Sequence, residues 1–79
     1  MAMTSYSLKD VERFTERRMK SMSDSIYYNA YCVGEEDFID WESEDAISRE
    51  MIKDDVRDHF TMLTPTQLRR IDAFIEGLH

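Results

Sequence analysis

The apolar residues of this chain recur at steps of three and four, and this helical period constrains the fold more than any other feature. The first series runs through Leu8, Val11, Thr15, Met19, Met22, Ile26, Ala30 and Val33. Ser7 can cap the start of a helix by accepting from the backbone N–H of Asp10, and Gly34 follows where a left-handed C-cap is wanted. The pattern predicts one long helix from Leu8 to Gly34.

A strand interpretation competes for the second half of this stretch. Residues 21–25 resemble a turn, and residues 26–33 are rich in strand formers. In this alternative, residues 26–33 and 38–42 form a hairpin around residues 34–37, which gives an α+β fold with the element order αββαα. The continuous helix is preferred because its period spans the whole segment, whereas the strands would alternate poorly.

The clearest helix start lies near the C-terminus, at residues 64–67. Thr64 is an N-cap, Pro65 occupies the first helical position, and Gln67 completes a capping box. The apolar stripe that follows comprises Leu68, Ile71, Phe74, Ile75 and Leu78. A C-terminal helix that closes a small core is expected.

The middle of the chain is expected to contribute a helix capped by Ser43 and running to about Met62. Its core face would be Ile52, Val56, Phe60 and Leu63, with Phe38 and Trp41 packing against the same core just upstream. A chain of 79 residues without repeat or linker has material for one core only. We therefore expect residues 1–79 to form a single all-α domain of three helices, with an acidic connection between the first two.

Negative charge is concentrated in the middle of the sequence. The chain has 17 acidic and 10 basic residues, for a net charge of −7, and residues 35–58 alone contain eleven of the acidic residues and three of the basic ones. Seven carboxylates fall within residues 35–45. This charge should repel nucleic acid and anionic membranes, so direct binding to either is not expected.

The remaining chemistry of the sequence is sparse. Cys32 has no disulfide partner and is expected to be a small buried residue, and residues 1–7 lack the regions of a signal peptide, so the expected compartment is the cytoplasm. Asp55 and His59 share a helix face but do not make a zinc site without further ligands. No catalytic motif is present, and we expect neither an enzyme nor a cofactor or metal.

The acidic run can be interpreted as an imitation of nucleic acid. If residues 35–58 were wholly helical, their carboxylates would lie about 3.3 Å apart along the axis, close to the phosphate spacing of one DNA strand. Phe38 and Trp41 could anchor such an interface. The candidate partner-binding residues are Glu35, Glu36, Asp37, Phe38, Asp40, Trp41, Glu42, Glu44, Asp45, Asp54, Asp55 and Asp58.

Two alternatives remain open. The acidic helix could be a solvated face held by the pairs Asp45–Arg49, Glu50–Lys53 and Asp54–Arg57. It could also use an exposed apolar strip of Ile47, Met51 and Met62, with Met19 and Met22 acting similarly, in a helical adaptor or regulatory homodimer. A basic stripe of Lys9, Arg13, Arg17, Arg18 and Lys20 would weaken the imitation of nucleic acid if it paired with the acidic middle.

In size, acidity and absence of catalytic motifs the chain resembles the small inhibitors encoded by phages and mobile elements, of which anti-CRISPR proteins are the best-known class. The resemblance is one of profile over the whole chain and carries no residue correspondence. It implies a stoichiometric inhibitor that occupies the basic groove of a nucleic-acid-binding protein, such as a CRISPR effector, in the cytoplasm of a bacterial host. An antitoxin that shields a basic toxin would use the same electrostatics.

Overall fold

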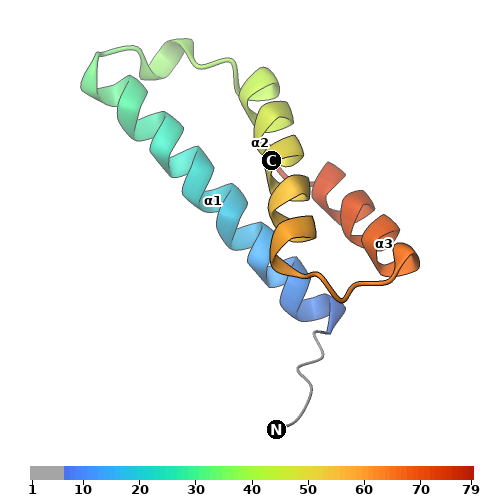
Figure 1. Ribbon diagram of the computed structural model, residues 1–79. Coiled ribbons are helices and arrows are strands. Elements are labelled where there is room, and N and C mark those ends of the chain that lie inside the picture. Colours follow the sequence, from blue (N-terminus) through green and yellow to red (C-terminus); the bar gives the residue numbers. More distant parts are fainter. Residues whose placement is uncertain (1–6) are drawn as a thin grey trace, which may run out of the picture.

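The computed structural model describes residues 7–79 and consists of three α-helices (Figure 1). These are α1 (Leu8–Cys32), α2 (Trp41–His59) and α3 (Pro65–Glu76), with a short 3-10 helix η1 (Glu36–Phe38) between the first two. The described residues contain no strand, so the predicted three-helix fold is confirmed and the hairpin alternative is wrong. Residues 1–6, on which the expected absence of a signal peptide depends, lie outside the described residues.

Helix α1 begins at Leu8 as predicted and ends at Cys32, two residues before the predicted end at Gly34. The Ser7 side chain accepts from the backbone N–H of Asp10 at 3.1 Å, and the Asp10 carboxylate accepts from the N–H of Ser7 at 3.4 Å. At the other end Gly34 has a φ of 73°, the left-handed conformation that glycine adopts most readily. The Glu35 N–H then donates to the Ala30 carbonyl at 2.8 Å, which completes a Schellman motif.

Helix α2 is shorter at its C-terminus than predicted and begins earlier. Its N-cap is Asp40 and not Ser43, because Asp40 precedes the helix in a non-helical conformation and accepts from both the N–H and the hydroxyl of Ser43. It ends at His59 and not near Met62, since residues 60–64 reverse the chain into α3. Helix α3 has the predicted capping box, in which the Thr64 hydroxyl accepts from the Gln67 N–H at 3.2 Å.

All three helices contribute to the core. The buried apolar residues are Val11, Met19, Ile52, Val56, Phe60, Ile71 and Ile75, and Leu63 packs against them, so the predicted core face of α2 is confirmed. Met19 is therefore part of the core and not of an exposed strip, and Met22 is half-buried against the same cluster.

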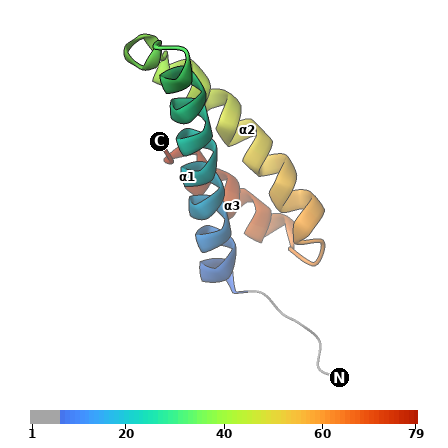
Figure 2. The same ribbon diagram turned by 90° about the vertical axis from the view of Figure 1, so that its left-hand side faces the viewer.

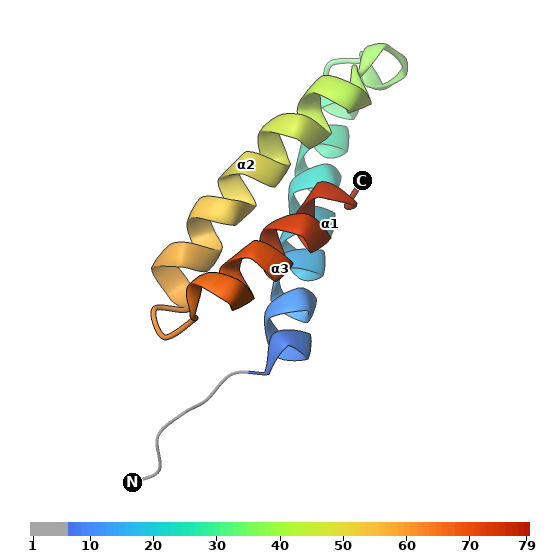
Figure 3. The ribbon, with the colours of Figure 1, turned by 90° about the vertical axis from the view of Figure 1, so that its right-hand side faces the viewer.

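Helix α3 covers only one end of the α1–α2 pair. Figures 2 and 3 show it beside the N-terminal part of α1 and the C-terminal part of α2, while the opposite end consists of α1, η1 and α2 alone. Side chains at this uncovered end have no third layer to pack against. Phe38 is 83% exposed and Cys32 is also exposed, so the core position predicted for Phe38 and the burial predicted for Cys32 are wrong.

No helix among residues 7–79 combines the length and the apolar character that crossing a membrane requires.

Candidate protein-binding surface

The acidic segment is folded into several short pieces at the uncovered end. The chain leaves α1 through Gly34, forms η1, becomes extended at Ile39 with φ −68° and ψ 125°, and enters α2 after Asp40. A continuous helix over residues 35–58 is therefore wrong, and with it the regular carboxylate spacing near that of DNA phosphates. Residues 35–45, which carry seven of the carboxylates, form the connection and the start of α2 at the uncovered end (Figure 1), and the other four carboxylates lie farther along α2.

The carboxylates of residues 35–45 differ in their access to solvent. Glu35, Asp37, Asp40 and Glu42 are exposed, and Glu36 and Glu44 are half-buried. Asp45 is only 8% exposed because it lies seven residues before Ile52, on the side of α2 that faces the core. Asp45 therefore presents little of its side chain to a partner.

Asp40 has a structural role that competes with partner binding. Its two carboxylate oxygens accept from the Ser43 N–H at 3.4 Å and from the Ser43 hydroxyl at 2.8 Å. These hydrogen bonds stabilise the charged form and hold the pKa of Asp40 below its ordinary value. Reversing the charge of Asp40 would damage the start of α2 as well as any interface.

A shallow groove lies between the C-terminal end of α1 and the connection into α2. It is lined by Ile26, Asn29, Ala30, Glu35, Phe38, Ile39, Asp40 and Glu44. The lining thus combines apolar side chains with three carboxylates. A groove of this composition suits a long cationic side chain, whose methylene stem packs on apolar atoms while its charged head meets carboxylate oxygens.

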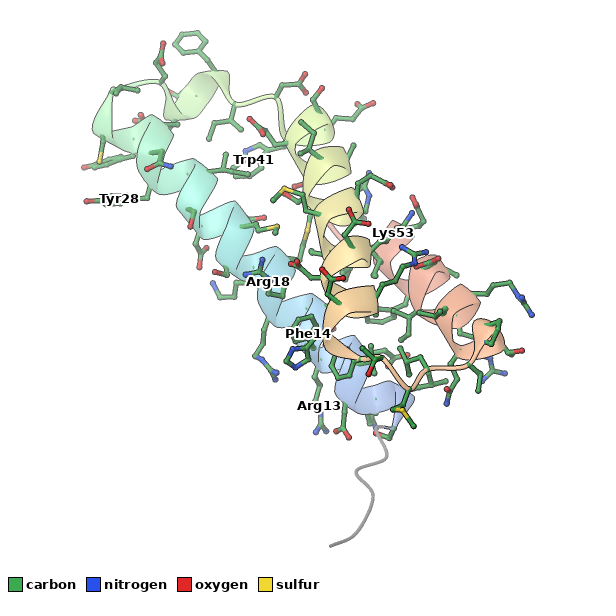
Figure 4. The ribbon with its side chains drawn as sticks, in the orientation of Figure 1. Arg13, Phe14, Arg18, Tyr28, Trp41 and Lys53 are labelled. Atoms are coloured by element: carbon green, nitrogen blue, oxygen red, sulfur yellow. The ribbon has the colours of Figure 1, made fainter. Side chains whose placement is uncertain are left out.

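Trp41, in the first turn of α2, extends toward α1 (Figure 4) and keeps 37% of its surface exposed. It lies outside the buried cluster, so the expected packing of Trp41 against the main core is wrong. With Phe38 it gives the uncovered end two aromatic side chains among the carboxylates. Aromatic residues in such surroundings are typical of interface anchors.

The basic side chains of α2 are turned toward α3 and the C-terminal residues. Arg49 donates to the Leu78 carbonyl at 2.8 Å, Lys53 pairs with Glu76 and with Glu50 at 3.1 Å, and Arg57 pairs with Asp72 at 2.8 Å. Of the three pairs predicted within α2, Glu50–Lys53 is therefore confirmed. Asp45–Arg49 and Asp54–Arg57 are wrong, because acceptors beyond α2 bind both arginines.

The outward face of α2 carries acidic and apolar side chains together. Ile47, Met51, Asp54 and Asp58 follow one another at steps of four, three and four, which places them on one side of the helix. All four are exposed, Ile47 by 57% and Met51 by 52%. Met62 is 65% exposed but lies in the turn after α2, so it does not extend this strip as predicted.

One candidate carboxylate is neutralised within the chain. Arg18 of α1 binds Asp55 at 2.8 Å, and both side chains are partly exposed. Lys20 pairs with Asp24 of its own helix at 3.0 Å. Among residues 7–79, the basic stripe of α1 thus removes Asp55 alone from the candidate surface.

Asp55 and His59, which share a face of α2, each contact a different residue of α1. Arg18 occupies Asp55, and the His59 ring stacks on Phe14 with ring centroids 5.0 Å apart and planes 9° apart. Among residues 7–79 no group of three or more histidine, cysteine, aspartate or glutamate side chains is arranged to hold a metal ion.

A comparison of the chain with known protein families, curated proteins and solved structures finds no match.

Proposed function

We propose that this protein is a stoichiometric inhibitor that blocks the basic groove of a nucleic-acid-binding protein, with a bacterial CRISPR effector as the first candidate. The observation that carries the proposal is the segregation of charge on α2. Its basic side chains are engaged by α3 and the C-terminal residues, so they do not dilute the carboxylates on the outward face.

The proposed surface consists of those exposed carboxylates of residues 35–58 whose side chains have no ion pair or hydrogen-bond partner among residues 7–79. These are Glu35, Asp37, Glu42, Asp54 and Asp58. The negative charge of these carboxylates steers a basic partner toward them and makes its association sensitive to salt. Phe38, Ile47 and Met51 then supply the apolar contacts that slow dissociation.

The test is displacement of labelled duplex or guide-paired DNA from a panel of purified CRISPR effectors and other DNA-binding proteins. We expect an excess of the protein to release DNA from at least one of them at low salt, and less at high salt. Asp37→Lys should weaken the release. Glu16→Lys is the matched control, because it changes the net charge equally at an exposed position on α1.

The outcomes separate a surface effect from a general charge effect. Equal losses from Asp37→Lys and Glu16→Lys would show that only net charge matters, and no release from any member of the panel would refute inhibition of these proteins. A basic toxin belongs in the same panel, because an antitoxin would present the same carboxylates to it.

A second function, a helical adaptor with apolar contacts, is favoured by one observation. Ile47 and Met51 are exposed side by side on α2, where a monomer gains nothing from them. For such an adaptor, Ile47→Ser and Met51→Ser would abolish partner binding while Asp37→Lys and added salt would leave it nearly unchanged.

A further inference from the structure

The outer face of α1 carries a second organised surface. Its residues occur at steps of four, three, four, three and four, the spacing of a coiled-coil seam: Arg13, Arg17, Lys20, Asp24, Tyr27 and Tyr31. All six are exposed. The N-terminal half of this seam is cationic and its C-terminal half is aromatic. We call these six residues the α1 seam.

The α1 seam has no covering element in the described chain. Val11, Thr15 and Met19 face α2 and α3 from the other side of the helix, and Tyr28, which flanks the seam, points away from α2 in Figure 4. Arg13 and Arg17 form no ion pair with any of residues 7–79, although acidic side chains are abundant. Three tyrosines of one helix are 49% to 66% exposed.

The α1 seam is complementary to a second copy of itself that runs in the opposite direction. If a second α1 lies antiparallel, with a twofold axis midway between Lys20 and Asp24, each Lys20 meets the other copy's Asp24. The pair that Lys20 and Asp24 form within one copy at 3.0 Å then becomes part of a cluster of four alternating charges. Arg17 then meets Tyr27, and Arg13 meets Tyr31. A parallel arrangement would instead place arginine on arginine and aspartate on aspartate. Only the antiparallel arrangement pairs every position favourably.

We propose that the α1 seam binds a second copy of this chain in an antiparallel homodimer. Arginine and tyrosine are among the residues enriched in protein interface hot spots, and a guanidinium over a tyrosine ring adds a cation–π attraction. Asp24 and three tyrosines line a shallow depression, which would receive Arg17 of the second copy. Tyr27 and Tyr31 already stack within one copy, with ring centroids 6.3 Å apart, so the receiving surface is partly ordered.

Charge also favours this face over the others. Each copy has a net charge of −7, and the acidic majority lies on residues 35–58. The α1 seam has three basic residues and one acidic residue, so two copies repel each other least when they meet there. The dimer leaves the acidic surface free on both copies and is independent of the proposed inhibitor function.

A single-stranded nucleic acid is the other ligand that a basic and aromatic face can bind. Asp24 in the centre of the α1 seam and the overall negative charge oppose phosphates, whereas Asp24 is a required partner in the dimer. The test therefore includes an oligonucleotide.

The experiment is analytical ultracentrifugation of the full chain from about 1 µM to about 1 mM, the range suited to a one-helix interface. We expect a reversible monomer–dimer equilibrium. Lys20→Asp and Asp24→Lys should each weaken it at least about tenfold, because like charges then meet at two symmetric positions. An equimolar mixture of the two variants should restore dimers, since each variant complements the other. The double variant should also restore them.

Three results would overturn the proposal. The unaltered chain could remain monomeric throughout, Lys20→Asp could leave the equilibrium unchanged, or the mixture could fail to associate while circular dichroism shows both variants folded.

The orientation of the two helices is tested in a Cys32→Ser background by oxidising a mixture of Arg13→Cys and Tyr31→Cys. Mixed disulfides support the antiparallel dimer, and disulfides within each variant alone contradict it. Binding of a labelled poly-dT strand that is lost in Arg17→Glu would reassign the face to nucleic acid.

Discussion

Arg18 and Asp55 connect α1 to α2 through two hydrogen bonds to a single carboxylate oxygen. The Arg18 Nε and Nη2 groups donate to Asp55 Oδ2 at 3.2 and 2.8 Å. The pair lies 37 residues apart in sequence, so it fixes a tertiary contact that local propensity does not dictate. Because of this contact Asp55 has an ion-pair partner, whereas Asp54 and Asp58 remain without an ion pair among residues 7–79.

The Arg18–Asp55 pair should contribute modestly to stability. Both side chains are about two-fifths exposed, so a double-mutant cycle with Arg18→Ala and Asp55→Ala should give a coupling of about 0.5–1 kcal/mol at low salt. The coupling should shrink in high salt because the pair is screened. Urea unfolding monitored by circular dichroism measures both values, and a coupling that is zero at low salt would contradict the contact.

Asp40 should make the stability of the protein depend on pH. Its pKa is lowered by the hydrogen bonds from Ser43, so the folded state favours the charged carboxylate more than the unfolded state does. The resulting stability is fully present above the ordinary aspartate pKa of about 4 and is lost as the pH falls through the lower folded value. Asp40→Ala should lower the melting temperature at pH 7 and flatten this acid-side slope.

Asp40→Asn separates the two contributions of this residue. Asparagine is also a good N-cap, so the variant should retain most of the stability at pH 7 while losing the pH dependence that Asp40 provides. The measurement is the melting temperature of the three proteins between about pH 2 and pH 7. An unchanged acid-side slope in both variants would assign the pH dependence to other groups.

Gly34 should be required for the geometry of the acidic end. Its φ of 73° lies in the left-handed region, and a Cβ would meet no atom within 4 Å, so the cost of substitution is conformational rather than steric. Gly34→Ala should destabilise the protein by about 1–2 kcal/mol, and Gly34→Asn by less, because asparagine visits this region more readily. Equal unfolding free energies for all three proteins would contradict the left-handed cap.

Asp45 should be replaceable with a gain in stability. Its Oδ1 atom is buried and has no hydrogen-bond partner among residues 7–79. Asp45→Ala removes an unpaired buried oxygen and introduces a good helix former, so the unfolding free energy should rise by about 1 kcal/mol. Glu42→Ala, at an exposed position in the first turn of the same helix, is the control and should change the unfolding free energy less. A loss of stability in Asp45→Ala alone would show that the carboxylate has a stabilising partner.

Local rules were sufficient to predict the helices and most of the core. The caps at Ser7, Gly34 and Thr64 depend on residues within a few positions, and the period of Ile52, Val56 and Phe60 is set by the helix itself. The sequence predicts too late a start for α2 because two residues compete to cap it. Aspartate and serine are both residue types that cap helices well, and the extended approach through Ile39 favours Asp40 over the later Ser43.

The candidate surface was less predictable because it depends on how far α3 reaches. The sequence does not show that α3 leaves one end of the α1–α2 pair uncovered, so Phe38 and Cys32 were expected inside and are exposed. Likewise, the arginines of α2 had suitable partners within their own helix and bind the C-terminal region instead. Which acceptor an arginine binds depends on the groups that the tertiary fold brings near it, and the periodicity of the sequence carries no information about those groups.

The mixed face of α2 should divide the binding kinetics of the proposed inhibitor between its two kinds of side chain. Asp54→Asn with Asp58→Asn should lower the association rate and its dependence on salt, because these carboxylates act at a distance on the approaching partner. Ile47→Ser with Met51→Ser should raise the dissociation rate and leave association nearly unchanged, because apolar contacts form only after docking. Surface plasmon resonance against a DNA-binding protein that the unaltered chain displaces from DNA measures both rates. The charge control is Glu12→Gln with Glu16→Gln on α1, which changes the net charge by the same two units. If both double variants changed only the dissociation rate, long-range steering by the acidic surface would be refuted.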